Sequence, residues 1–250
     1  MALTQEQSVH YGRNIAAFGE EGQEKLLRGK VLVIGAGGLG SPISYYLTAG
    51  GVGTVGIVDY DVVDSSNLQR QILHSTHTLG QPKVVSAKKR LTALNPDVTI
   101  KTYEEKITKE TLPQIISDGA YDFVVDGTDN FTAKFLINDV CVSLGQPFSH
   151  AGVLRYGGQT MTYLPGKGPC YRCLFETEPA PGDVPTSKEV GILGAVAGTI
   201  GTIQATEAIK YLLGMTDKLL VGKLLIYDGE HMTFRRIDVP RNPHCTACGG

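Results

Sequence analysis

The stretch from Lys30 to Asp61 constrains the fold more than any other part of this sequence. It opens with four apolar residues, 31–34, which are typical of a parallel strand covered on both faces. Gly35, Gly37 and Gly40 then follow in the spacing G-x-G-x-x-G, with a fourth glycine, Gly38, between the last two. Such glycines permit a tight turn and let backbone N–H groups approach a phosphate at a helix N-terminus.

A second apolar segment, Val55–Val58, ends in Asp59. An acidic residue about 20 positions after such glycines usually holds a ribose hydroxyl. The stretch therefore predicts a nucleotide site, but NAD, FAD and ATP sites all use this geometry. The competing interpretation is a glycine-rich turn used for packing alone, and the order of strand, glycines, helix, strand and acid argues against it.

The composition excludes several classes of protein. The chain has 250 residues, of which 42% are hydrophobic, and this suits a globular protein with a core. A formal net charge of −2 without a basic tract argues against nucleic acid as a partner. Apolar runs stay well below the ~20 residues of a membrane span, and the first residues lack a signal-peptide core. We therefore expect a cytoplasmic protein with no membrane partner.

Strands and helices alternate up to about residue 150, and the pattern then changes to hairpins around one long small-residue helix. This order predicts an α/β fold with a Rossmann-like, mostly parallel sheet, an antiparallel extension and helices on both faces. We expect one compact domain over residues 1–250. Its parts would be an N-terminal helical arm (1–28), a nucleotide-binding part (29–150) and a second part (151–250). The proline-rich segment 176–189 predicts a mobile loop.

A polar loop follows Asp59 and carries Asn67, Arg70 and Gln71. Such folds bind ligands in loops at the carboxyl ends of parallel strands. Arg70 is a candidate phosphate clamp, because a guanidinium can meet two phosphate oxygens at once. Lys83 begins the next predicted helix, where a cation opposes the helix dipole unless an anion balances it.

The strand predicted over 123–125 is followed by Asp126, Thr128, Asp129 and Asn130. Acids at the carboxyl end of a parallel strand beside a nucleotide suggest magnesium coordination. The alternative is that Asp129 only caps the helix that follows, and the two roles are compatible.

Two C-x-x-C pairs lie far apart in the sequence, Cys170 with Cys173 and Cys245 with Cys248. Four thiolates match tetrahedral zinc, and a closed four-sulfur shell leaves no open position for catalysis. The zinc would therefore be structural and would pin the C-terminal tail to residue 170. A redox pair and an iron–sulfur cluster are the alternatives. The fifth cysteine, Cys141, falls in a helix where we expect it to be buried.

The ordered motifs GAGGLG, DYD, SNLQRQ, GQPK, DGTDN, CYRC and CTAC resemble the MoeB/ThiF/HesA adenylyltransferases, bacterial relatives of ubiquitin-activating enzymes. The resemblance runs from HYGRN to the C-terminus. It implies an enzyme that binds ATP and Mg²⁺ and adenylates the C-terminal Gly-Gly carboxylate of a ubiquitin-like sulfur carrier such as ThiS or MoaD. Pyrophosphate would leave, and the pathway would be thiamin or molybdenum-cofactor biosynthesis.

The resemblance also assigns roles. Gly38 would lie against the phosphates and Asp59 would hold the ribose. The triphosphate would be held and neutralised by Asn67, Arg70 and Lys83. The further nucleotide-binding residues would be Gly35, Gly37, Gly40, Asp61 and Gln71.

Three more roles follow from the same resemblance. Asp129 would hold magnesium, with Asn130 beside it, and Arg13 in the arm would reach the ATP of a neighbouring subunit, which requires a homodimer. The second part of the chain, 151–250, would bind the carrier.

The sequence departs from its relatives in the loop 176–189. Relatives that bind their carrier covalently have a cysteine there, whereas Ser187 stands at the matching position. We therefore predict adenylation without a covalent cysteine intermediate. The alternative functions are an NAD-dependent oxidoreductase and a relative that activates another substrate such as tRNA. The final Gly249–Gly250 pair is interpreted as the end of the zinc knuckle, not as a carrier tail.

Overall fold

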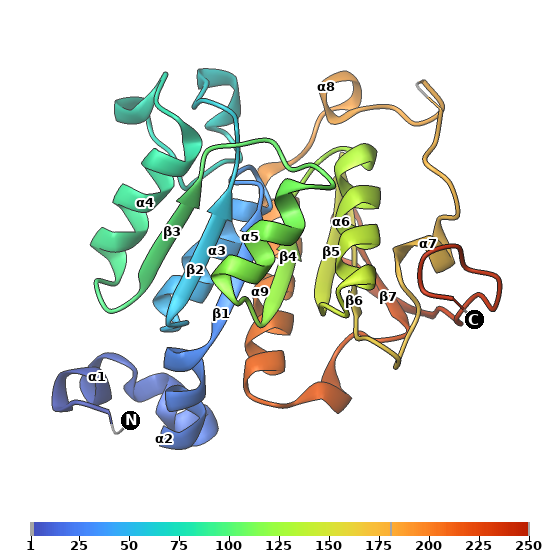
Figure 1. Cartoon of the computed structure of the whole chain (residues 1–250). Coiled ribbons are helices and arrows are strands. Elements are labelled where there is room, and N and C mark those ends of the chain that lie inside the picture. The colour runs from blue at the N-terminus through green and yellow to red at the C-terminus, as the bar shows by residue number, and fades with distance from the viewer. Residues whose placement is uncertain (1–2, 181, 250) are drawn as a thin grey trace.

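A single eight-stranded sheet forms the centre of the molecule, as the computed structural model of residues 3–180 and 182–249 shows (Figure 1). The strand order is β3-β2-β1-β4-β5-β6-β7-β8. The first five strands in this order pair in parallel and the remaining pairings are antiparallel. The strands are β1 (Lys30–Ile34), β2 (Thr54–Val58), β3 (Thr99–Tyr103), β4 (Phe123–Asp126), β5 (Phe148–Leu154), β6 (Gly157–Tyr163), β7 (Lys223–Asp228) and β8 (Thr233–Asp238).

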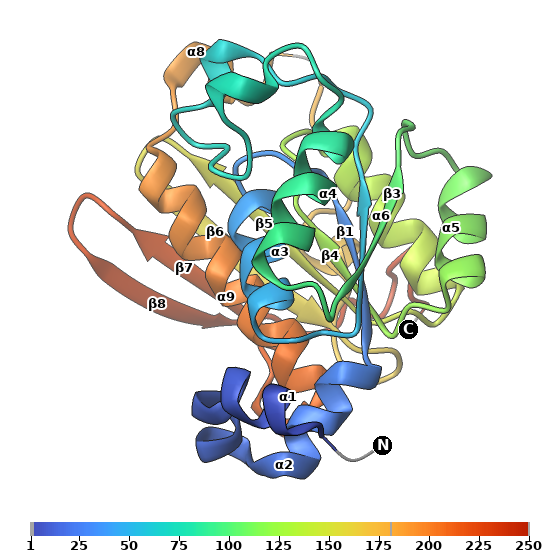
Figure 2. The same ribbon diagram turned by 90° about the vertical axis from the view of Figure 1, so that its left-hand side faces the viewer.

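Helices cover both faces of this sheet (Figure 2). Helices α3, α4 and α9 pack on one face, and α5 and α6 pack on the other. The predicted fold class is therefore confirmed. The helices are α1 (Gln5–His10), α2 (Gly12–Arg28), α3 (Gly40–Ala49), α4 (Lys83–Leu94), α5 (Thr111–Gly119), α6 (Phe131–Ser143), α7 (Tyr171–Leu174), α8 (Ser187–Val190) and α9 (Gly194–Leu212), with short 3₁₀ turns η1 (Ser65–Asn67), η2 (Thr76–Thr78) and η3 (Thr216–Lys218).

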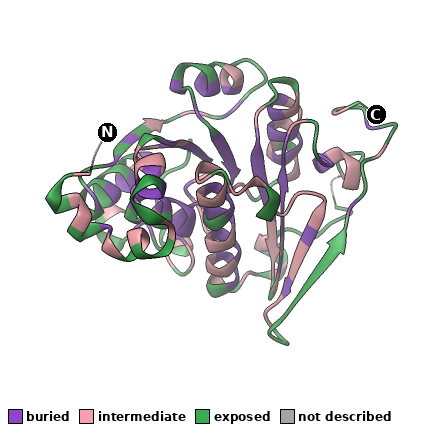
Figure 3. Cartoon of the chain, turned by 90° about the horizontal axis from the view of Figure 1, so that it is seen from below, coloured by how far each residue is buried: buried purple, intermediate pink, exposed green. Residues whose placement is uncertain are grey.

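The apolar run of β1 reflects its central position. Val31 and Val33 belong to the hydrophobic core under α3, α4 and α9, whereas Leu32 and Ile34 belong to the core under α5 and α6. Successive side chains point to opposite faces, so a strand buried on both faces needs apolar residues at every position. The edge strand β8 shows the contrast, because all of its residues are exposed (Figure 3).

The N-terminal arm is helical, as the sequence predicts. It forms two helices, with the chain broken between them at Tyr11 and the second helix kinked at Gly19, where φ is 79°. The arm lies at the amino ends of the parallel strands (Figure 1). Tyr11 is buried, and its hydroxyl accepts a hydrogen bond from Asn95 Nδ2 at 2.8 Å. The arm is thus fixed to the domain.

The loop 176–189 differs from the prediction. Its last part enters the one-turn helix α8, whose N-cap Thr186 forms a capping box with Glu189. Capping satisfies backbone donors that an irregular loop would leave open. Residue 181 in this loop lies outside the described residues. Among the described helices, none combines the length and the apolar character that would let it cross a membrane.

Candidate functional site

The glycine loop lies between the carboxyl end of β1 and the N-terminus of α3. A Cβ atom at Gly40 would stand 1.8 Å from the carbonyl oxygen of Gly35, so the loop closes only with glycine there. Gly35 itself has φ of 96°, and its Cβ would lie 2.9 Å from the carbonyl oxygen of Gly127 after β4. The glycines therefore let two strand-end loops pack backbone to backbone, and the loop faces the carboxyl edge of the sheet.

The other two glycines face the polar loop that follows β2. A Cβ at Gly37 would lie 3.6 Å from Gln71 Nε2, and one at Gly38 would lie 3.4 Å from Arg70 Cγ. The structure therefore brings Gly35, Gly37, Gly38 and Gly40 together with Arg70 and Gln71, as the sequence predicts.

Asp59 anchors this loop. Its Oδ2 accepts a hydrogen bond from the backbone N–H of Ala36 at 2.7 Å, and its Oδ1 accepts one from Asp61 N–H at 2.8 Å. The sequence predicts a ribose-holding carboxylate, and the structure adds a role in shaping the site. A carboxylate has about four acceptor positions, so both roles are open to it.

His74 supports the same loop and was missed by the sequence interpretation. Its Nε2 lies 2.9 Å from the carbonyl oxygen of Ala36, and its Nδ1 lies 2.9 Å from Ser86 Oγ. Since a carbonyl only accepts, Nε2 carries the proton. Burial lowers the pKa of His74, so the ring is neutral at physiological pH. The sequence indicates this role only by the position of His74, between the polar loop that carries Arg70 and the helix that begins at Lys83.

The η1 turn positions the polar side chains of the loop after β2. Gln71 Nε2 donates to Asn67 Oδ1 at 2.8 Å, and Arg70 Nη1 donates to the carbonyl oxygen of Ser66 at 3.3 Å. Arg70 is half-buried, and its Cγ and Cδ atoms lie 3.4 and 3.6 Å from the position that a Cβ at Gly38 would take. The arrangement presents a cation next to the glycine loop.

Lys83 begins α4, and the anion that balances it comes from the protein itself. Its Nζ lies 2.8 Å from Asp61 Oδ2, and its side chain is only 5% exposed, against 52% for Asp61. The sequence predicts that an anion balances Lys83, and the family resemblance implies that this anion is the triphosphate. The structure instead shows an ion pair at the edge of the site, in which the exposed partner is the carboxylate.

Asp126 at the end of β4 and Asp129 in the loop that follows lie in different surroundings. Asp126 is fully buried, and Lys134 Nζ lies 3.0 Å from its Oδ2. Asp126 is thus enclosed and does not face the site, which corrects the expectation that both acids lie at a metal. Asp129 is exposed, and its carboxylate forms no hydrogen bond or ion pair with any residue in 3–180 and 182–249. The cap of α6 is Asn130, whose side chain accepts from Ala133 N–H at 2.9 Å, so the capping role considered for Asp129 is wrong.

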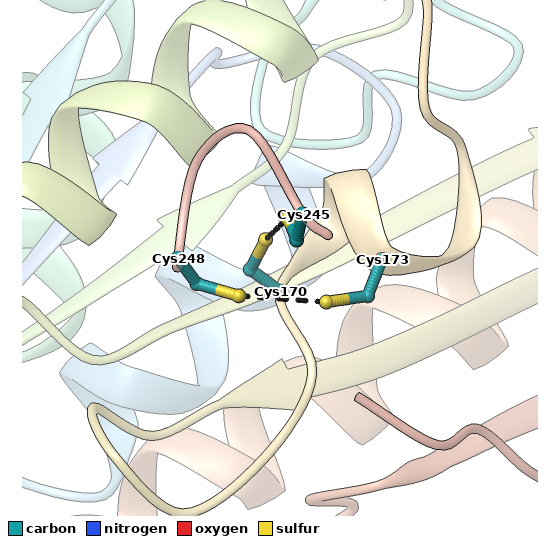
Figure 4. A group of neighbouring side chains, drawn as sticks. All are labelled: Cys170, Cys173, Cys245 and Cys248. Atoms are coloured by element: carbon teal, nitrogen blue, oxygen red, sulfur yellow. Dashed lines mark hydrogen bonds between the residues drawn. The ribbon is translucent and has the colours of Figure 1, made fainter. Parts of the chain in front are cut away.

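The four cysteines of the two C-x-x-C pairs converge where the short helix α7 (Tyr171–Leu174) meets the C-terminal tail (Figure 4). Their Sγ atoms all lie within 4.8 Å of one another, and Sγ–Sγ distances are 3.5 Å for Cys170–Cys245 and for Cys173–Cys248. Disulfides require about 2.05 Å, so these are not disulfides. Tetrahedral bonds of about 2.3 Å to a metal place sulfurs about 3.8 Å apart, which fits.

Protonation at this cluster is uneven. Burial raises the pKa of Cys170. At Cys245 burial also acts to raise the pKa, but the hydrogen bonds from the backbone of Cys248 and Ala247 and from the neighbouring thiols together lower it to about 7. Thiolate is the form that binds metals. Cys141 lies apart from the cluster, fully buried, and burial raises its pKa, as expected for a structural cysteine.

Comparison with known proteins identifies the family. The model of the ThiF family matches residues 11–247, nearly the whole chain. The chain belongs to the ThiF family.

Three proteins illustrate the range of similarity of this ThiF-family chain. It is 44% identical over 256 aligned positions to the sulfur carrier protein adenylyltransferase of Thermus thermophilus, covering 100% of this chain and 93% of that protein. It is 44% identical over 251 positions to the SAMP-activating enzyme E1 of Haloferax volcanii, covering 100% and 92%. Among solved structures, E. coli MccB with ATP superposes with a TM-score of 0.82 at 24% identity, covering 96% of this chain and 73% of that one. The last similarity concerns the fold alone.

Two predicted residues of this ThiF-family protein lie away from the glycine loop. Arg13 is exposed on α2, at the amino ends of the strands, so within one chain it does not join the site (Figure 1). Ser187 begins α8 in the crossover loop, where its carbonyl oxygen accepts from Gly191 N–H. Gly249 is described at the end of the tail, whereas Gly250 lies outside the described residues.

Proposed function

We propose that this protein is an ATP-dependent adenylyltransferase that activates the C-terminal Gly-Gly carboxylate of a ubiquitin-like sulfur carrier. The carrier would be ThiS-like or MoaD-like, for thiamin or molybdenum-cofactor biosynthesis. The relatives at 44% identity support this function by name and by nearly full coverage. The observation that carries it is the convergence of the glycine loop, Arg70 and a free Asp129 carboxylate at one edge of the sheet.

ATP would lie across the carboxyl ends of β1, β2 and β4. Backbone N–H groups at the start of the ten-residue helix α3 would face its phosphates. Arg70 would neutralise phosphate charge beside Gly38, with Asn67 and Gln71 as hydrogen-bonding neighbours. Asp59 would use its remaining acceptor positions for the ribose.

Lys83 and Asp61 would act as a pair. When the triphosphate arrives, the Lys83 ammonium has a second anion available, and the exposed Asp61 can turn toward solvent. A cation near transferred phosphate stabilises developing negative charge. This account keeps the predicted role of Lys83 beside the ion pair with Asp61.

Asp129 would hold Mg²⁺. Magnesium in nucleotide sites usually takes one or two protein carboxylates together with phosphate oxygens and water. An exposed carboxylate that has no partner among the described residues fits this demand. Bound there, the ion would neutralise phosphate oxygens.

The chemical step needs no general base. The carrier carboxylate is already ionised, so its oxygen forms a bond to the α-phosphorus while the bond to the β-phosphate bridging oxygen breaks and pyrophosphate leaves. The protein contributes alignment and charge neutralisation. A covalent cysteine intermediate is not part of the proposal, because Ser187 occupies the crossover loop and Cys141 is fully buried.

The remaining parts of the proposal concern assembly. A homodimer would bring Arg13 of one subunit to the ATP of the other, which agrees with its distance from the site in its own chain. Residues 29–150 would bind the nucleotide and residues 151–250 the carrier, in the cytoplasm. Zinc on Cys170, Cys173, Cys245 and Cys248 would be structural.

The test is carrier-dependent pyrophosphate release from ATP. We expect release only with a carrier that ends in Gly-Gly, and none with the same carrier lacking its last glycine. In a parallel binding measurement, ATP with Mg²⁺ should raise the melting temperature and NAD should not. Stabilisation by NAD without carrier-dependent release would overturn the proposal in favour of an oxidoreductase.

A further inference from the structure

Lys134 on α6 is a buried lysine that the proposed chemistry does not use. Its side chain is 7% exposed, and it lies beside the fully buried Asp126. Burying a charge is costly unless it is paired and hydrogen-bonded, so such a residue needs an explanation.

The ammonium group uses all three of its donors. They go to Asp126 Oδ2 at 3.0 Å, to the carbonyl oxygen of Thr128 at 2.8 Å, and to the carbonyl oxygen of Ala151. A lysine has exactly three such N–H groups, so the match is complete. Lys134 thereby joins the end of β4, the loop after it, and the neighbouring strand β5.

One of these hydrogen bonds holds the residue next to Asp129, the predicted magnesium ligand. The carbonyl of Thr128 belongs to the peptide group that precedes Asp129. On the other side, Asn130 is fixed as the N-cap of α6, because its side chain accepts from Ala133 N–H at 2.9 Å. Asp129 thus sits between a carbonyl held by the Lys134 ammonium and a residue fixed by helix capping.

Asp126 completes the arrangement. Its Oδ1 accepts from both the N–H and the hydroxyl of Thr128, at 2.9 and 2.6 Å, while Oδ2 is held by Lys134. The next residue, Gly127, donates its N–H to Ile34 at the end of β1. The bonds therefore place the Asp129 loop against the glycine loop.

We propose that Lys134 is a positioning residue that holds the backbone of Thr128 and Asp129, so that the Asp129 carboxylate meets Mg²⁺ and ATP in one orientation. Lys134 touches neither ATP nor the metal. The inference rests on the proposed function for the identity of the ligand. A small misplacement of such a group is enough to reduce rate strongly.

The experiment compares Lys134→Met with Lys210→Met as a matched control. Lys210 also pairs with a buried carboxylate, Glu207, and also donates to a backbone carbonyl, that of Lys218 at 2.6 Å. It lies near the C-terminal end of α9, away from the glycine loop (Figure 1). A third variant, Asp126→Asn with Lys134→Met, removes the unpaired buried charge and keeps an acceptor for Thr128.

Two quantities are measured for each variant, the Mg²⁺ concentration that gives half of the ATP-induced rise in melting temperature, and the rate of carrier-dependent pyrophosphate release. For Lys134→Met we expect the Mg²⁺ half-point to rise about tenfold and the rate to fall about 10- to 100-fold. Lys210→Met should lower the melting temperature while both quantities stay within about twofold of wild type. The double variant should regain melting temperature but keep the shifted half-point.

The inference is overturned if Lys134→Met lowers the melting temperature but leaves the Mg²⁺ half-point and the rate as in wild type. It is also overturned if the double variant has the wild-type Mg²⁺ half-point. Should Lys134→Met fail to fold, the double variant decides by the same half-point. If wild-type protein releases no pyrophosphate with any carrier, the proposed function fails, and the Mg²⁺ half-points still decide on Lys134.

Discussion

The nucleotide-binding edge of the sheet and the four-cysteine cluster are both assembled from residues far apart in the sequence, but different interactions hold them. At the edge, Asp59 binds the backbone of Ala36, and Lys134 binds Asp126 and the loop that follows. In the cluster, two pairs of thiols approach at 3.5 Å with only weak contacts between them. Sulfur is a poor hydrogen-bonding atom, so we expect a metal ion to join these segments.

The loops at the edge are held by hydrogen bonds within the protein, whereas we expect the cysteine cluster to be held by the proposed zinc. The tail that carries Cys245 and Cys248 has few other anchors, among them Asn242 to Glu176 at 3.1 Å. Without the metal, we expect the tail with Cys245 and Cys248 to detach, while the nucleotide-binding edge of the sheet keeps its structure.

Removing zinc should give the largest effect on stability. The metal closes a loop between segments 75 residues apart, and by analogy with a disulfide its loss should cost about 4 kcal/mol of unfolding free energy. We expect Cys248→Ser, or chelation, to lower the urea midpoint and to increase proteolysis within the tail, while ATP with Mg²⁺ still stabilises the protein. If ATP protection vanished with the zinc, the two regions would not be independent.

Arg70→Ala should have the next largest effect, on rate. Removing a charge-stabilising group from such a site costs about 10²- to 10³-fold, or about 2.7–4 kcal/mol. Pyrophosphate release under single-turnover conditions measures it. Arg90→Ala is the matched control, since Arg90 is exposed on α4 and bonds only to Tyr45 among its described partners. Equal rates for the two variants would remove Arg70 from the chemistry.

Gly40→Ala tests whether the edge depends on backbone packing. The added Cβ would meet the carbonyl of Gly35 at 1.8 Å, so the loop must shift, at a cost of about 2–3 kcal/mol. Chemical denaturation measures the loss, and ATP stabilisation should weaken with it. Gly198→Ala, in α9 with nothing within 4 Å, should be neutral or slightly stabilising. A Gly40 variant as stable as this control would contradict the packing account.

Acid should weaken the edge through His74. Its folded-state pKa is lowered by burial, so below the unfolded pKa of about 6.5 the unfolded chain takes up a proton that the folded chain does not. Stability contributed by His74 is thus complete above pH 6.5. It falls by up to about 1.4 kcal/mol per pH unit below that value, until the folded-state pKa is reached.

Unfolding by urea at pH 7.5 and at pH 5.5 measures this effect. We expect His74→Gln to reduce the difference in stability between the two pH values, and the exposed His77→Gln to leave it as in wild type. A His74 variant with the full wild-type pH dependence would show that other groups cause it.

Ser187→Ala should have the smallest effect. Ser187 enters α8 through its backbone carbonyl, so removing its hydroxyl should change the adenylation rate by less than about twofold. A large loss in the pyrophosphate assay would give the crossover loop a chemical role that the proposal does not include.

Much of the fold follows from the sequence, because periodic patterns report burial. The apolar run of β1, the glycine spacing and the paired cysteines each led to the correct element or cluster. The helix start at Lys83 predicts a balancing anion, but the sequence does not indicate that Asp61, 22 positions away, lies 2.8 Å from it.

The remaining features depend on tertiary contacts that leave no local pattern. Lys134 lies in the first turns of α6, where nothing in the sequence distinguishes it from a solvent-exposed lysine. In the structure it is buried beside Asp126. Asp126 and Asp129 are three residues apart, and the sequence suggests a magnesium-binding role for both. In the structure Asp126 is buried in the core, whereas Asp129 is exposed. His74 gave no signal of its contact with Ala36, 38 positions away.

The most direct test of the account is the mass of both proteins after incubation of the enzyme with ATP, Mg²⁺ and a Gly-Gly carrier. Intact-mass spectrometry should show one adenylyl group added to the carrier and an enzyme of unchanged mass. A carrier that stays unmodified, or an enzyme that becomes covalently joined to it, would contradict the account.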